Sequence, residues 1–137
     1  MRRIIIIVVT LLITSSCLFI SNKQNIERQT KVTYSNDGSY MYQTDYLNGK
    51  LDGISSTWNE KGKLVGKTEY VNGFIHGNRV KYFEDGVVMY DCEYEFGKQH
   101  GQEKFYYKDG SIKRINIYEY GKKVSTKRYQ IDGKLEY

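Results

Sequence analysis

The sequence predicts an all-β fold, a single twisted antiparallel meander of tandem β-hairpins with a solenoid-like repeat. Tyrosine is abundant, with 14 copies, and proline is absent. Aromatic residues suit a pleated, half-buried surface, and glycine supplies the positive φ that tight turns need. Glycines also recur every 24 residues in two series, at Gly38, Gly62, Gly86 and Gly110 and at Gly49, Gly73, Gly97 and Gly121.

Each repeat is predicted as two strands joined by a turn that ends in glycine. Residues 78–83 form one strand, Glu84-Asp85-Gly86 the turn, and residues 87–94 the return strand. A second connection precedes this unit at Asn72-Gly73, and the same pair of turns recurs along the chain. The pattern predicts about four and a half hairpins between residues 33 and 137.

Alternation along the return strands predicts two different faces. Tyr46, Tyr70, Tyr94 and Tyr118 lie on one face at the repeat spacing. Asp45, Glu69 and Glu93 lie on the other, which is expected to be acidic and solvated, as is common in antiparallel sheets.

The repeat unit resembles a known family. Tyr70-Val-Asn-Gly-Phe-Ile-His-Gly77 and Tyr94-Glu-Phe-Gly-Lys-Gln-His-Gly101 are similar to MORN repeats, and more closely to the bacterial MORN-repeat variant with its Tyr-x-x-Gly-x-x-x-Gly core. The resemblance covers about residues 34–135. It implies a protein that binds through its repeats, and some bacterial proteins of this variant are catalogued as antitoxins of toxin–antitoxin pairs.

The N-terminus is typical of an export signal. Arg2 and Arg3 precede an apolar run over residues 4–13, and Thr14-Ser15-Ser16 lead into Cys17. The pattern resembles the bacterial lipobox, which implies lipidation at Cys17. We therefore expect a signal peptide at 1–16, a lipidated Cys17 and tether at 17–32, and the repeat domain at 33–137. An uncleaved anchor over residues 4–20 and a simple cleaved signal remain alternatives. Each places the folded part outside the cytosol, at the bacterial cell envelope.

Two sets of residues are candidates for binding. Trp58, Tyr82 and Tyr106 recur on one strand of each repeat and form either a packing ladder or an exposed aromatic groove. The C-terminal end is basic and favours contact with an anionic membrane, through Lys122, Lys123, Lys127 and Arg128.

No catalytic, metal or cofactor site is predicted. His76 and His100 occupy equivalent repeat positions, but a protein zinc site needs three or four ligands. A formal net charge of +5 is too modest to favour nucleic acid as the partner. The leading hypothesis is a non-enzymatic envelope lipoprotein whose repeat surface binds a protein partner. Direct binding to anionic lipid and an antitoxin-like role are the alternatives, and the oligomeric state is left open.

Overall fold

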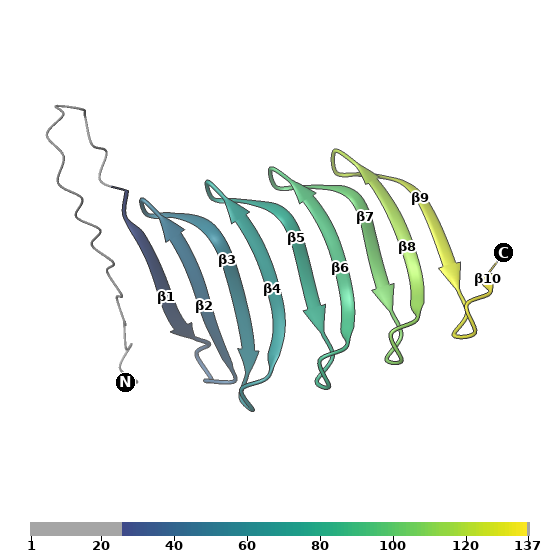
Figure 1. Cartoon of the computed structure of the whole chain (residues 1–137), viewed down its shortest axis with the longest axis horizontal. Coiled ribbons are helices and arrows are strands. Elements are labelled where there is room, and N and C mark those ends of the chain that lie inside the picture. The colour runs from purple at the N-terminus through teal and green to yellow at the C-terminus, as the bar shows by residue number, and fades with distance from the viewer. Residues whose placement is uncertain (1–25, 137) are drawn as a thin grey trace, which may run out of the picture.

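A computed structural model describes residues 26–136, which form one open sheet of ten antiparallel strands in chain order (Figure 1). This confirms the predicted all-β meander of hairpins. Because these residues form only strands and turns, none of them belongs to a helix that could cross a bilayer. The predicted signal peptide and Cys17 lie outside the described residues. The strands are β1 (Arg28–Tyr34), β2 (Tyr40–Leu47), β3 (Lys50–Asn59), β4 (Leu64–Val71), β5 (Phe74–Tyr82), β6 (Val88–Glu95), β7 (Lys98–Tyr106), β8 (Ile112–Glu119), β9 (Lys122–Tyr129) and β10 (Leu135–Glu136).

The sheet begins at Arg28, earlier than the domain boundary expected at residue 33. β1 pairs with β2 along its whole length, from Arg28 opposite Leu47 to Tyr34 opposite Met41. The repeat pattern has no glycine ahead of Gly38 to mark this strand. Part of the expected tether is therefore the first edge strand.

Two-residue turns form one edge of the sheet, the upper edge in Figure 1, which we call the short-turn edge. Both residues of each turn have positive φ, between 44° and 51° at the first and between 78° and 89° at the second. Such φ values match type I′ turns, whose twist suits the flanking strands. The glycine N–H of Gly73 also donates to the carbonyl of Leu51 at 2.7 Å and thereby links consecutive hairpins. The turns are Asn48-Gly49, Asn72-Gly73, Phe96-Gly97 and Tyr120-Gly121.

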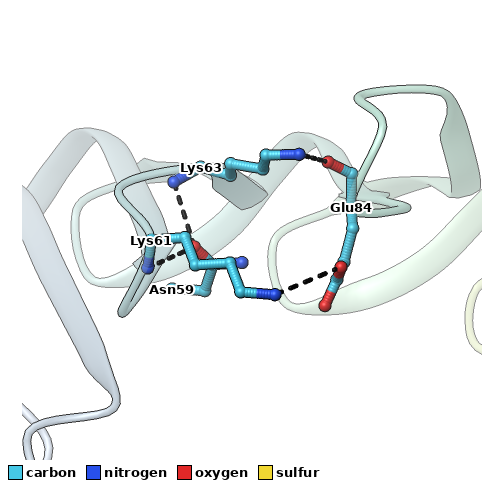
Figure 2. Close-up of polar contacts among 4 residues, drawn as sticks. All are labelled: Asn59, Lys61, Lys63 and Glu84. Atoms are coloured by element: carbon cyan, nitrogen blue, oxygen red, sulfur yellow. Dashed lines mark hydrogen bonds and ion pairs between the residues drawn. The ribbon is translucent and has the colours of Figure 1, made fainter.

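Longer turns form the opposite edge, the long-turn edge, and they are linked by polar contacts. Asn59 Oδ1 accepts the backbone N–H groups of Lys61 and Lys63, both at 3.0 Å, which fixes the turn between β3 and β4. Lys63 Nζ then donates to the Glu84 carbonyl at 2.8 Å, and Lys61 lies 3.7 Å from the Glu84 carboxylate (Figure 2). Each exposed ion pair of this kind contributes little, at most about 1 kcal/mol.

The sheet is a single layer with two distinct faces. Directly paired residues of neighbouring strands lie on the same face. The Cys92 face carries one cross-strand row, Thr44, Ser55, Thr68, Arg79, Cys92, Glu103, Asn116 and Thr126. The Trp58 face carries the next, Gln43, Ser56, Lys67, Val80, Asp91, Lys104, Ile115 and Lys127.

Very little of the described chain is enclosed. Among residues 26–136 Cys92 is the one fully buried hydrophobic side chain, at 1% exposure. Most strand residues are half-buried, because each side chain packs only against its neighbours on the same face. Stability therefore comes from cross-strand pairs repeated along the sheet, as in other repeat proteins.

Candidate binding surface

The acidic residues Asp45, Glu69 and Glu93 have a structural role that the alternation of the sequence did not predict. Asp45, on β2, lies over the α-carbon of Gly53, on β3, and accepts the N–H of Ile54 at 3.2 Å. The pairing register shifts at this point, so the carboxylate stabilises a bulge in the sheet. The same arrangement recurs in the next two hairpins, with Glu69 over Gly77 and Glu93 over Gly101.

The last hairpin lacks this acid–glycine pair. Ile117 and Ser125 stand at the two positions and pair directly across β8 and β9. The acid and the glycine are thus replaced together. The two residues therefore form one structural unit, in which the carboxylate supplies an acceptor and the glycine leaves room for it.

The predicted aromatic residues Trp58, Tyr82 and Tyr106 share the Trp58 face and are half-buried. Each lies opposite an aliphatic residue of the following strand, Leu64, Val88 and Ile112 respectively. Aromatic and aliphatic cross-strand pairs stabilise sheets. The structure gives these rings a packing role.

The four basic residues of β9 do not form one surface. Lys127 pairs with Ile115 on the Trp58 face, whereas Arg128 pairs with Arg114 on the Cys92 face. Lys122 and Lys123 lie at the other end of the strand, beside the turn of the short-turn edge. All four side chains are exposed.

A buried polar network lies at the centre of the Cys92 face. Glu103 and Asn116 are 7% and 4% exposed, and the Asn116 amide donates to Glu103 Oε2. The Gln99 amide and the Tyr90 hydroxyl donate to Glu103 Oε1, both at 3.2 Å. Burial raises the pKa of Tyr90, so the hydroxyl remains a donor across the physiological range.

Beside this network lies a row of cations and aromatic rings that the sequence did not single out. We call it the basic–aromatic row, Lys81, Tyr90, Phe105, Arg114 and Arg128, each paired directly with the next across β5 to β9. The Arg114 guanidinium lies 4.0 Å from the Phe105 ring centroid. The Tyr90 ring meets Phe105 edge-on at 5.1 Å. Only Arg128 was predicted as a binding residue.

The short-turn edge exposes three aromatic side chains. Phe74, Phe96 and Tyr120 are 55%, 61% and 72% exposed. Phe96 lies against His76 and Tyr120 against His100, with ring centroids 4.6 and 5.0 Å apart. The Phe96 and Tyr120 rings therefore touch the preceding hairpin but remain largely exposed.

The histidines do not meet each other. Each lies against the aromatic residue of the following turn, and residues 26–136 contain no group of three or more potential metal ligands. Comparison with family models, with curated proteins and with solved structures found no match for this chain. The function is therefore inferred from the chain's own residues.

Proposed function

We propose that the protein is a non-enzymatic binding module of the bacterial MORN-repeat-variant type, anchored at the cell envelope, and that its sheet binds a protein partner. The main observation in support of this proposal is that the strands form one open sheet, a single layer. Both faces of the sheet are accessible, and the side chains that cross it at regular strand spacing form extended surfaces. Repeat proteins use surfaces of this kind to hold other proteins.

The place where the described chain joins the sheet supports a lipid anchor on Cys17. Glu27 and Asn48 exchange hydrogen bonds at 2.8 and 2.9 Å, which places the start of the described chain at the short-turn edge. At about 3.3–3.6 Å per residue, the segment from Cys17 to Glu27 reaches at most about 35 Å. A lipid on Cys17 would hold this edge near the membrane and leave both faces open.

Affinity capture tests the proposal. The full-length chain is extracted from envelopes in mild detergent, and a lipoprotein of similar size serves as the control for non-specific capture. We expect a protein recovered in near-equal amount with the chain. Recovery of nothing above the control would contradict the proposal.

A second candidate function is contact between the short-turn edge and the bilayer surface. Phe74, Phe96 and Tyr120 share this edge with three exposed lysines that follow the turns, Lys50, Lys98 and Lys122. Aromatic rings are enriched where proteins meet the headgroup region, and lysines there favour anionic lipid. This contact uses Lys122 of the predicted basic set but not Lys127 or Arg128, which lie at the far end of β9.

Tryptophan fluorescence tests this candidate. Trp58→Tyr removes the single tryptophan and installs the residue found at the equivalent positions of the next two repeats. In that background Phe96→Trp reports on the short-turn edge and Lys61→Trp on the long-turn edge. The full chain is placed in vesicles of phosphatidylethanolamine and phosphatidylglycerol that carry a headgroup quencher. We expect quenching at position 96 only, and equal quenching at both positions would contradict the contact.

A further inference from the structure

We propose that the basic–aromatic row on the Cys92 face is the binding site for an acidic, extended segment of a protein partner. This inference rests on the proposed function and names the chemistry of the partner. It follows from unneutralised charge, from the way one arginine is held, and from the spacing of the cations.

The row carries more positive charge than its surroundings neutralise. Within residues 26–136, its cations Lys81, Arg114 and Arg128 form no ion pair, and neither does the neighbouring Arg79. Like charges directly opposite one another destabilise a sheet, yet Arg114 faces Arg128 across β8 and β9. This pairing of two arginines therefore costs the sheet stability.

Nearby acids do not remove the excess charge. Glu103 is buried, and its oxygens accept hydrogen bonds from Asn116, Gln99 and Tyr90. Glu136, on β10, pairs with Arg128 of β9, but the two side chains are not within ion-pair distance. The cations therefore remain available to an external anion.

Arg114 is held in an orientation that suits a carboxylate. Its guanidinium lies over the Phe105 ring at 4.0 Å, and Tyr90 supports that ring from its other side along the row. Its buried Nε has no hydrogen-bond partner within the described chain. A guanidinium stacked on a ring keeps its donors free in the plane of the fork, where carboxylates bind in bidentate fashion.

The spacing of the row matches an extended peptide. Lys81 and Arg114 are separated by three strand-to-strand steps, about 14 Å at about 4.8 Å per step. In an extended chain, side chains four residues apart span about 13 Å and point in the same direction. Two acidic residues at this spacing would reach both cations, and the residue midway between them would lie over Tyr90 and Phe105.

The surface has room for such a segment. Two shallow depressions lie on either side of Phe105, one lined by Arg79, Lys81 and Tyr90 and the other by Lys113, Arg114 and Arg128. The site therefore favours the order acidic, any, apolar, any, acidic. Extended acidic peptide is preferred to a compact anion because the cations are spread across five strands.

Peptide binding tests the site. Fluorescein-labelled Glu-Ser-Leu-Ser-Glu is titrated with the full-length chain in detergent micelles at low salt, with Gln-Ser-Leu-Ser-Gln as the neutral probe. We expect the acidic peptide to bind at least about tenfold more tightly, because a hydrogen bond to a charged group is worth about tenfold or more in affinity. Equal binding of the two peptides would overturn the inference.

Variants locate the binding on one face. Arg114→Gln and Lys81→Gln are each expected to weaken binding of the acidic peptide about tenfold, and Phe105→Leu to weaken it with the charge intact. Lys104→Gln removes the same charge from the Trp58 face and is expected to change affinity less than about twofold. An equal loss in Lys104→Gln would show a non-specific charge effect and overturn the site.

Failure of this site can be separated from failure of the proposed function. If Arg114→Gln captures an envelope protein as well as the wild-type chain does, the site is wrong and the binding module stands. If the wild-type chain captures nothing but binds the acidic peptide through Arg114, the site stands and the proposed function is wrong.

Discussion

The carboxylate of Glu69 lies over the α-carbon of Gly77 and accepts the backbone N–H of Asn78 at 3.0 Å. Gly77 has φ of 96°, a conformation that side chains other than glycine rarely adopt. β5 bulges at this point, and the carboxylate occupies the space where a β-carbon would stand. The glycine of the repeat and the acid of the preceding strand are thus one structural unit.

Gly77→Ala is expected to destabilise the protein by about 1–3 kcal/mol, because alanine would combine positive φ with a clash against the Glu69 carboxylate. Urea denaturation followed by circular dichroism measures the change. Gly66→Ala is the matched control, since Gly66 lacks a positive φ and an added methyl group would meet its nearest neighbour at an ordinary 3.6 Å. Similar losses in both variants would contradict the bulge as the cause.

Glu103→Ala is expected to lower the free energy of unfolding by about 1–3 kcal/mol, because it leaves the buried Asn116 amide without its acceptor. Glu95→Ala removes an exposed carboxylate from the neighbouring strand and should change stability by less than about 0.5 kcal/mol. Thermal melting of the two variants provides the comparison. A loss in Glu95→Ala as large as in Glu103→Ala would argue against a buried network.

Phe96→Asn and Tyr120→Asn are expected to raise the free energy of unfolding by up to about 1 kcal/mol each. Asparagine tolerates the positive φ of these positions and already occupies them at Asn48 and Asn72. The ring contacts with His76 and His100 are lost, but the rings are mostly exposed, so this loss is the smaller effect. Equilibrium denaturation measures the change, and a net loss of stability would show that the stacking dominates.

The free energy of unfolding is expected to fall at acid pH, in part because carboxyl groups in the turns of the long-turn edge become protonated. Hydrogen bonds from Ser111 lower the pKa of Asp109, and those from Lys134 lower the pKa of Asp132. A carboxyl with a depressed folded-state pKa stabilises the protein above its ordinary value of 3.8, and this contribution disappears as pH falls through the lower folded value. Asp109→Asn keeps an acceptor but does not titrate. Wild type should therefore lose more stability than Asp109→Asn between about pH 5 and pH 2, and parallel pH profiles would contradict this.

The turns and strands could be predicted from the sequence because the constraint on each is local. A two-residue turn with positive φ at both positions favours asparagine and glycine, so Asn72-Gly73 marks the connection of β4 to β5 without further information. The 24-residue recurrence then extends that assignment along the chain. β1 was partly missed because an edge strand without a flanking glycine carries no such local signal.

The basic–aromatic row could not be predicted because it depends on register. Arg114 occupies the repeat position of Tyr90 and Gly66, and Phe105 occupies that of Lys81. A search for recurring residues passes over positions whose residue type is not kept along the repeats. Bulges in each hairpin then decide which of them face one another, as Phe105 faces Arg114. The candidate site thus consists of residues in which the repeats differ.

The most direct measurement of the central claim is photo-crosslinking in intact cells from two adjacent residues. Phe105 and Tyr106 follow each other on β7 and lie on opposite faces of the sheet. Benzoylphenylalanine at position 105 should yield a discrete adduct with one envelope protein, whereas the same group at position 106 should yield none. Adducts of equal strength from both positions, or none from either, would contradict a binding module that uses the Cys92 face.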